Sequence, residues 1–403
     1  MIGKIFVLCL VAIFLQAETL YVGHLEEGYL SFMERESEET DGFLSLQSFL
    51  PEKILFRKAA NELYVQLKDS SYVYVVDCLE KTVKSRLDLQ EKVCDACLQE
   101  PYLFATSPSY FLIFDLREQK FLTKMPHNLK GALRLAINLE GDLAFITGDG
   151  GMLQTVNLTS KQMSDAVSLN PGNLGAICPG PHENEMVIAS SSYDYDLLVW
   201  NYRKKTVRKL CSLINVVEGG NQILISPDGK YLYVLGEKTA NVGRFDWEKQ
   251  VWDRSLPVSL GASSFTITKD GSHLYVGSSI QKSLDSISLD TFNTVREILF
   301  PYPPCAVLVE PCHPVQNLSV RQIEQQFLSG KERRNILEWE TLAGAKVAYY
   351  LVRKNGQLLR KLAPEDKMFL EDGRIQKGEK AVYEVVAVSA SGTHSQGYQT
   401  IVP

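Results

Sequence analysis

The sequence has no segment long and apolar enough to cross a membrane once residues 1–17 are set aside. Of its 403 residues, 45% are hydrophobic and 22% are charged. No later apolar run approaches the roughly eighteen residues of a membrane-spanning helix. Excess positive charge is also missing, because 42 Lys and Arg face 48 Asp and Glu, for a net charge of −6. Since a nucleic-acid binder needs a basic face, we expect no nucleic-acid partner. Because no later apolar run is long enough, we also expect no membrane span in the mature chain.

Metal and cofactor motifs are scarce as well. The six histidines show no short-range pairing, and there is no haem-attachment motif, nucleophile elbow or Walker loop. We therefore expect no metal site and no cofactor. Cys94 and Cys97 form a Cys-x-x-Cys pair, but they lack the strand-to-helix context of a thioredoxin site. A local disulfide or two packed thiols is favoured over redox catalysis.

Residues 1–17 have the layout of a secretory signal peptide. Lys4 is followed by the apolar run Ile5–Leu15 and then by Gln16-Ala17, with Ala at the expected cleavage position. The alternative is a buried N-terminal strand. Cleavage would leave seven cysteines, an odd number that leaves at least one thiol unpaired in a monomer. We expect an exported chain, secreted or periplasmic, and a monomer.

An internal repeat runs through most of the chain. A hydrophobic residue followed by Asp, Asn or Ser recurs at Val76-Asp77, Phe114-Asp115, Val156-Asn157, Trp200-Asn201, Phe245-Asp246 and Ile287-Ser288. Successive spacings are 38, 42, 44, 45 and 42 residues, and Phe32 lies 44 residues before Val76. The spacings define seven units of about forty-two residues.

Each unit holds four short strand-like pieces. In one unit they read "NQILISPDG", "KYLYVLG", "NVGRFDWE" and "VWDRSLPV". Four short strands per forty-odd residues are typical of a β-propeller blade, whose two-faced sheet must stack on neighbours to bury its apolar residues. A large β-sandwich is the alternative, but it would not explain a constant period.

The stretch "SPDGKYLYV" followed by "NVGRFD" resembles the YVTN repeat of seven-bladed propellers. Leu232-Tyr233-Val234 and Leu274-Tyr275-Val276 match that family's strand, whereas its Thr-Asn is replaced by Leu-Gly and Gly-Ser. The resemblance is close in the last two units and weak in the first three. It implies an all-β fold, and the family includes lactonase-like enzymes, quinoprotein subunits and envelope binding proteins.

The two ends of the propeller should meet in one blade. The mature chain begins with "ETLYVGHLEEG", which aligns with the second strand of a blade rather than the first. The missing innermost strand is expected from "PPCAVLVEP", with residues 303–310 pairing against the N-terminal strands. This arrangement would remove the exposed edges of the sheet. The predicted propeller therefore spans residues 18–311.

A second domain is expected over residues 314–403, where the period disappears. This part resembles a fibronectin type III domain, a β-sandwich. The resemblance rests on Trp339 in "NILEWE", on the hairpin signal Asn355-Gly356, and on Tyr383 in the position of the tyrosine corner. We expect a spacer or adhesive module, and none of these residues indicates catalysis.

The candidate site residues lie on loops and strand ends that would face the central funnel. Arg134 is a charged residue within an apolar innermost strand, and residues 193–196 combine aromatic and acidic side chains. The alternative for this loop is a polar turn with aromatic packing beneath it. The candidates are His24, Arg134, Tyr193, Asp194, Tyr195 and Asp196.

Two functions remain compatible with the sequence. The favoured one is an exported, non-catalytic propeller that binds a protein partner in the cell envelope. The alternative is a lactonase-like or other hydrolytic enzyme with an acid–base set in the funnel, assembled from His24, Arg134 and Asp194. Because one fold supports many chemistries, the fold alone does not separate them.

Overall fold

The structure is a computed structural model of the chain. It describes residues 18–35, 40–47, 49–169, 172–190, 195–236, 238–310, 315–327, 330–341, 347–355, 357–366, 368–370, 381–389 and 398–402. The expected signal peptide at residues 1–17 and the candidate residues Tyr193 and Asp194 lie outside the described residues.

Strands β1 to β29 form seven antiparallel sheets. The first joins β29 (Pro304–Glu310), β1 (Thr19–His24), β2 (Tyr29–Glu34) and β3 (Thr40–Ser45). The second holds β4 (Pro51–Arg57), β5 (Glu62–Leu67), β6 (Tyr72–Asp77) and β7 (Thr82–Asp88). The third holds β8 (Asp95–Gln99), β9 (Tyr102–Thr106), β10 (Tyr110–Asp115) and β11 (Lys120–Pro126).

The fourth sheet differs from the others in its outer strand, which is split into two short pieces. It holds β12 (Arg134–Ile137), β13 (Leu143–Thr147), β14 (Met152–Asn157), β15 (Gln162–Met163) and β16 (Val167–Ser168). A 3₁₀ turn, η1 (Asp149–Gly151), precedes β14. Among the described residues, no helix is long and apolar enough to span a membrane.

The last three sheets of the series again have four strands each. The fifth holds β17 (Leu174–Pro179), β18 (Glu185–Ser190), β19 (Asp196–Asn201) and β20 (Thr206–Ser212). The sixth holds β21 (Gly220–Ile225), β22 (Tyr231–Gly236), β23 (Asn241–Asp246) and β24 (Val251–Pro257). The seventh holds β25 (Ala262–Ile267), β26 (His273–Ser278), β27 (Ser283–Ser288) and β28 (Asn293–Leu299).

The recurring Asp or Asn ends the third strand of a sheet and shapes the turn that follows. The Asp77 carboxylate accepts hydrogen bonds from the backbone N–H of Leu79 at 3.0 Å and of Glu80 at 2.9 Å. Asp246 accepts one from the N–H of Lys249 at 2.9 Å. Such a side chain mimics a backbone turn and so fixes the hairpin to the fourth strand. The predicted repeat therefore has a physical cause in the units whose third strand ends in Asp or Asn.

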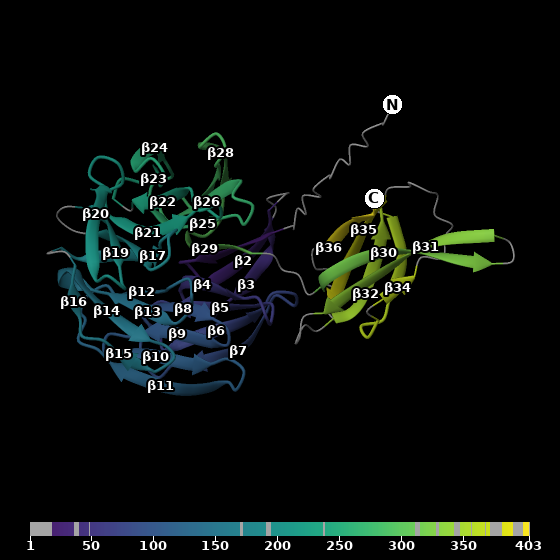
Figure 1. Cartoon of the computed structure of the whole chain (residues 1–403), viewed down its shortest axis with the longest axis horizontal. Helices are drawn as coiled ribbons and strands as arrows, with labels where there is room; N and C mark the ends of the chain where they lie inside the picture. The colour runs from purple at the N-terminus through teal and green to yellow at the C-terminus, as the bar shows by residue number, and fades with distance from the viewer. Residues whose placement is uncertain are drawn as a thin grey trace, which may run out of the picture.

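The sheets are stacked in a closed circuit through their innermost strands. Contacts run from β29 to β4, β8, β12, β17, β21, β25 and back to β29 (Figure 1). One hydrophobic cluster lies between each pair of neighbouring sheets, and seven such clusters complete the circuit. Alternate residues of one strand belong to different clusters: Val234 packs toward the fifth sheet and Leu235 toward the seventh. Because each sheet buries both faces, the stacking agrees with a β-propeller.

The first sheet joins the two ends of this part of the chain. Strand β29 pairs with β1, with Leu20 opposite Val309 and Val22 opposite Val307. Val307 and Val309 of β29 are buried against the seventh sheet, in the cluster that also contains Tyr275. This is the strand pairing that the sequence predicts for residues 303–310.

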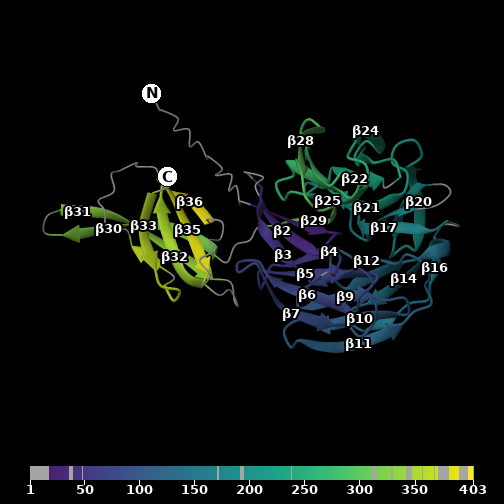
Figure 2. The ribbon, with the colours of Figure 1, turned by 180° about the vertical axis from the view of Figure 1, so that it is seen from behind.

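The described strands between residues 315 and 402 form a separate two-sheet unit beside the ring (Figures 1 and 2). One sheet has β30 (Val315–Phe327), β31 (Gly330–Thr341) and β34 (Met368–Leu370). The other has β33 (Gln357–Leu362), β32 (Val347–Lys354), β35 (Ala381–Ser389) and β36 (Tyr398–Val402). Leu337 and Trp339 from the first sheet share a core with Tyr350 and Tyr383 from the second. The Tyr383 hydroxyl accepts a hydrogen bond from Asn335 Nδ2 at 2.8 Å.

Candidate functional site

The described sequence candidates lie at one end of the seven sheets. At this end, here called the crossover end, the second strand of each sheet turns into the third and the chain passes to the next sheet. His24 ends β1, Arg134 begins β12 and Asp196 begins β19, with Tyr195 just before it. The strand order therefore gathers these residues at one end, although they come from three different sheets.

His24 has a fully buried side chain. Its Nδ1 lies 3.0 Å from the carbonyl oxygen of Tyr302, and its Nε2 lies 2.9 Å from Ser31 Oγ. A neutral ring satisfies both contacts, with Nδ1–H donating to the carbonyl and Nε2 accepting from the hydroxyl. Burial lowers the pKa of His24 to about 4, against the weaker opposing effect of the Tyr302 carbonyl. Both nitrogens are occupied and the ring is not accessible to a soluble ligand.

Arg134 belongs to a cluster of charged side chains on neighbouring innermost strands and one glutamine on β5. This cluster, here called the channel cluster, consists of Glu52, Lys53, Gln66, Asp95 and Arg134. Gln66 Nε2 donates to Glu52 Oε2 at 3.2 Å, and Lys53 Nζ lies 2.6 Å from Asp95 Oδ1. Burial raises the pKa of Glu52, and the positive charge of Arg134 opposes that shift. Burial would lower the pKa of Lys53, but Asp95 and Cys97 together raise it above its ordinary value.

Asp95 ties two sheets together within this cluster. Its side chain is 9% exposed, and its Oδ2 accepts a hydrogen bond at 2.8 Å from the backbone N–H of Leu135 in the next sheet. Its Oδ1 also accepts from the N–H of Ala96 at 2.9 Å. The carboxylate therefore satisfies buried donors that would otherwise lack a partner. The channel cluster is matched in charge and holds innermost strands β4, β8 and β12 together.

The structure does not bring His24 and Arg134 together. The contacts of His24 are with the first sheet and the loop that leads into β29. Arg134 donates to the carbonyl of Leu133 at 3.1 Å and interacts electrostatically with Glu52. The second and third sheets separate the first from the fourth along one side of the ring. Sequence reasoning missed Glu52 and Asp95, although each is a charged residue at the start of an apolar strand, the same signal that singled out Arg134.

Two residues of the aromatic–acidic loop of the fifth sheet, Tyr195 and Asp196, are described, and their surroundings differ. The Tyr195 hydroxyl accepts a hydrogen bond from Lys238 Nζ at 2.6 Å, and this ammonium also lies 5.1 Å from the Tyr195 ring centroid. Asp196 was expected in the same exposed loop, but it is 6% exposed and its carboxylate pairs with Lys209 Nζ at 2.7 Å. The reason is that Asp196 is already the first residue of β19, with β20 beside it. Asp196 is therefore a buried strand residue and not part of a surface loop.

Exposed apolar side chains lie on the seventh and first sheets toward the crossover end. We define the apolar patch as Phe43, Leu260, Ile280 and Leu299, which are 43%, 55%, 65% and 72% exposed. The loops that carry Leu260 and Ile280 adjoin, since the Leu260 N–H donates to Gln281 Oε1 at 3.0 Å. Lys282 in turn pairs with Glu26 of the first sheet at 3.0 Å. Loops normally carry polar residues. Leu260 in "SLGA" and Ile280 in "SSIQ" were therefore a sequence signal for an exposed apolar surface, and sequence reasoning missed it.

The Phe43 end of the patch is held by other aromatic rings. The ring centroids of Phe43 and Tyr302 are 6.1 Å apart, and those of Tyr29 and Tyr302 are 4.9 Å apart. Edge-to-face and offset arrangements of this kind hold rings in place. Phe43 is therefore a pre-positioned aromatic side chain, and such side chains are enriched at protein-binding surfaces.

The Cys-x-x-Cys pair consists of two free thiols. Cys97 Sγ donates to the carbonyl oxygen of Leu135 at 3.1 Å, and both cysteines pack against the cluster between the third and fourth sheets. Burial raises the pKa of both thiols, that of Cys97 to about 11. Since the thiolate is the reactive form, the structure supports packed thiols rather than a local disulfide or a redox centre.

Comparison with known proteins places the chain only at the level of fold. No known family profile matches it. It is 26% identical over 186 residues to Antigen Lp49 of Leptospira interrogans serogroup Icterohaemorrhagiae serovar copenhageni (strain Fiocruz L1-130). That match covers 43% of this chain and 40% of the relative, so the chain spans less than half of the curated relative's length.

Solved structures give wider coverage at lower identity. Hydrazine synthase of Kuenenia stuttgartiensis superposes with a TM-score of 0.59 at 13% identity, over 71% of this chain and 99% of that one. A functionally unknown protein from Desulfotomaculum acetoxidans DSM 771 superposes with a TM-score of 0.62 at 13% identity, over 72% of this chain and 98% of that one. A putative 6-phosphogluconolactonase from Bacteroides fragilis NCTC 9343 superposes with a TM-score of 0.62 at 15% identity, over 73% of this chain and 98% of that one. These likenesses support a propeller-like all-β fold and nothing about activity.

Proposed function

We propose that this protein is an exported, non-catalytic seven-bladed β-propeller with a C-terminal fibronectin type III-like domain, and that it binds a protein partner in the cell envelope. The observation that carries the proposal is the apolar patch, because large exposed apolar side chains grouped on a stable framework favour protein contacts. The relative named as an antigen is compatible with a protein at the cell surface. The seven units are the blades, with domain limits of 18–311 and 314–403.

Export follows in the same proposal from the signal-like residues 1–17. Cleavage after Ala17 would leave Glu18 as the first residue, directly before β1. Glu18 is 3% exposed, and its carboxylate pairs with Arg35 at 2.8 Å and accepts from the N–H of Lys269 at 3.0 Å. The mature protein should begin at or near Glu18 and lie outside the cytoplasm. N-terminal sequencing that finds residues 1–17 still attached would contradict this.

The lactonase-like alternative has less support. It needs an accessible general base near a positive group, within hydrogen-bond reach of a substrate. His24 is buried with both nitrogens bonded, and Arg134 lies in a different sheet beside Glu52. A lactonase assay of the purified protein, compared with the Arg134→Met variant, would revive this alternative if activity were present and then lost.

Binding is tested by a pair of variants that place charge at equally apolar positions. Leu260→Glu and Leu139→Glu both change an exposed leucine, 55% and 67% exposed, but Leu139 lies at the opposite end of the sheets. Partners are cross-linked to the exported protein in intact cells, identified by mass spectrometry, and remeasured as purified pairs. Leu260→Glu should weaken binding at least about tenfold, since desolvated central contacts carry most interface energy. If Leu139→Glu weakened partner binding and Leu260→Glu did not, the assignment of the binding surface to the crossover end would be contradicted.

A further inference from the structure

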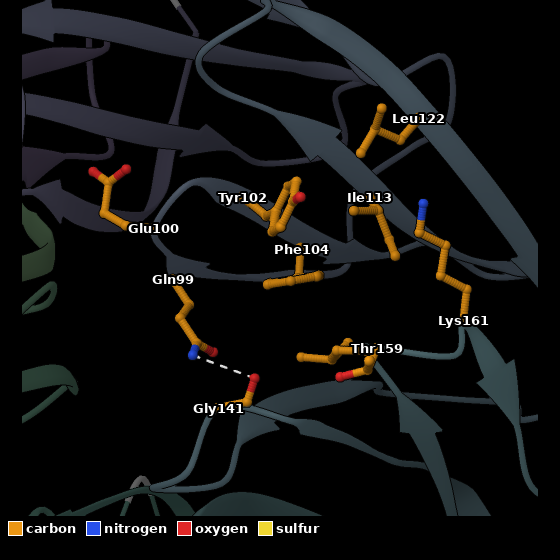
Figure 3. Close-up of a pocket in the computed structure, with 10 residues that line it drawn as sticks. Gln99, Glu100, Tyr102, Phe104, Ile113, Leu122, Gly141, Thr159 and Lys161 are labelled. Carbon is orange, nitrogen blue, oxygen red and sulfur yellow. Dashed lines mark hydrogen bonds between the residues drawn. The ribbon is translucent and has the colours of Figure 1, made fainter.

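A cavity of about 300 Å³ lies between the third and fourth sheets, at the end opposite the crossover end. Figure 3 shows the side chains around it. It is bounded by the turn from β8 to β9, by strands β9, β10 and β11, and by the turns after β12 and β14. Next to it, the outer strand of the fourth sheet starts with only the two-residue β15.

The walls of the cavity are partly apolar and partly polar. Tyr102, Phe104 and Ile113 line one side, and Leu122 and Leu158 complete the apolar lining. Phe104 and Ile113 are 3% and 2% exposed, so they form a fixed floor that belongs to the cluster between the two sheets. A planar or aliphatic group of the size of one ring would therefore meet carbon on several sides.

One polar side chain that lines the cavity has an unused acceptor, which is buried behind the cavity wall. Gln99 Nε2 donates to the Gly141 carbonyl at 3.3 Å, as Figure 3 shows, whereas Gln99 Oε1 is buried without a hydrogen-bond partner. The φ of Gly141 is +75°, and a Cβ there would lie 1.6 Å from Gln99 Nε2, so glycine permits this close approach. A buried acceptor without a partner favours a ligand that brings a donor.

The charge at the rim is positive. Glu100 is neutralised by Arg57, whose Nε lies 2.9 Å from Glu100 Oε1. Lys161 is exposed and, within the described part of the chain, makes no ion pair. Figure 3 shows Lys161 and Gln99 on opposite sides of the cavity, with Phe104 and Ile113 between them. A ligand spanning the cavity would meet a cation at one end and a hydrogen-bond acceptor at the other.

We propose that this cavity binds a small hydroxyaryl carboxylate. The ring packs against Phe104 and Ile113, and the carboxylate pairs with Lys161. The hydroxyl donates to Gln99 Oε1, which turns toward the ligand by rotation of the Gln99 amide. The volume suits one ring with a short acid chain, at the lower limit of about 300–1,000 Å³ for ligand sites. This inference does not depend on the proposed protein binding at the crossover end.

The test measures binding of 3-(4-hydroxyphenyl)propionate to the full mature protein by isothermal titration calorimetry and saturation-transfer NMR. Two probes separate the contacts: 3-phenylpropionate lacks the hydroxyl, and 2-(4-hydroxyphenyl)ethylamine reverses the charge. We expect 3-phenylpropionate to bind at least threefold more weakly and the amine at least tenfold more weakly. Equal binding of all three, or no binding of the first, would overturn the proposal.

Variants place the site on the protein. Leu122→Trp fills the cavity and should abolish binding, whereas Lys161→Ala should weaken it at least threefold. Lys205→Ala is the matched control, because Lys205 occupies the same left-handed turn position in the fifth sheet, with φ of 52° against 54° for Lys161. Since Lys161→Ala changes only an exposed turn residue, it keeps the test valid if Leu122→Trp does not fold. Equal effects of Lys161→Ala and Lys205→Ala would contradict the assignment.

Discussion

At the scale of the residue, polar side chains on the innermost strands act as links between sheets. Gln222 Oε1 accepts from the N–H of Phe265 at 2.9 Å, and Ser264 Oγ accepts from the N–H of Val307 at 3.1 Å. In each case donor and acceptor lie one repeat apart, as they do for Asp95 and Leu135. A charged or polar residue in an apolar innermost strand can therefore serve to link its sheet to the next one, and its presence alone does not indicate catalysis.

Asp95 offers a direct test of this role. Asp95→Ala removes the acceptor for the buried N–H of Leu135 and the partner of Lys53, and it should lower the free energy of unfolding by about 1–3 kcal/mol. Asp95→Asn keeps an acceptor oxygen and should cost less. Urea unfolding of both variants measures the difference. Equal stability of Asp95→Ala and the unchanged protein would contradict the link.

His24 predicts an acid-sensitive stability. Its pKa is lowered to about 4 in the folded protein, against about 6.5 in the unfolded chain. The unfolded state therefore binds the proton more readily, so the stability contribution is complete above pH 6.5 and is lost as the pH falls toward 4. That loss should reach about 3 kcal/mol. Urea unfolding at pH 7 and pH 4 measures it, with His24→Gln as the control that removes the titrating ring. The same pH dependence in both proteins would rule out His24 as its source.

At the scale of the element, each sheet is a unit that depends on its neighbours. Both faces of a four-stranded sheet carry apolar residues, and each face belongs to a different cluster. The turn after the third strand is set locally by Asp or Asn and by a residue with positive φ four positions later, such as Lys81 after Asp77. Local sequence thus makes the hairpins, and packing between sheets makes them stable.

Strand β29 provides the prediction at this scale. A chain ending at Pro301 lacks β29 and leaves β1 with an unpaired edge, whereas a chain ending at Pro314 retains it. Ala306, Val307 and Val309 are 2%, 7% and 3% exposed, so the shorter chain exposes the apolar surface that they cover. At about 25 cal/mol per Å², the loss is of the order of several kcal/mol. Thermal unfolding measures the melting temperatures of the two chains. Equal melting temperatures would mean that the ring closes in another way.

At the scale of the whole molecule, the ring and residues 315–402 have separate cores. Leu337, which is fully buried, packs with Trp339 and Tyr350, whereas Leu232, also fully buried, packs between the fifth and sixth sheets. The described hydrophobic clusters contain residues of either the ring or the C-terminal unit. Domains with their own cores can unfold independently.

We therefore expect two calorimetric transitions that respond to different mutations. Leu337→Ala should destabilise only the C-terminal unit and Leu232→Ala only the ring, each by about 2–5 kcal/mol. Differential scanning calorimetry of the full mature chain measures both. A single transition that shifts with either variant would show that the two units unfold together.

The sequence by itself determined the features that depend on local or periodic chemistry. Alternating apolar residues and turn residues predicted the strands, and the recurring Asp or Asn predicted a regular series of four-stranded units, because these signals act over a few neighbouring residues. The strand partner of the N-terminus was also predicted, since a blade that begins at its second strand needs a first strand from elsewhere.

Only the tertiary structure decided which polar residues are exposed and which of them meet. Asp196 looked like a surface acid but is buried at the start of β19, and His24 is buried between Ser31 and the Tyr302 carbonyl, which is 278 residues away in sequence. The cavity beside Lys161 and the apolar patch also combine side chains from different sheets. Burial and contact at these sites follow from the stacking of separate units, and no short segment of the sequence carries that information.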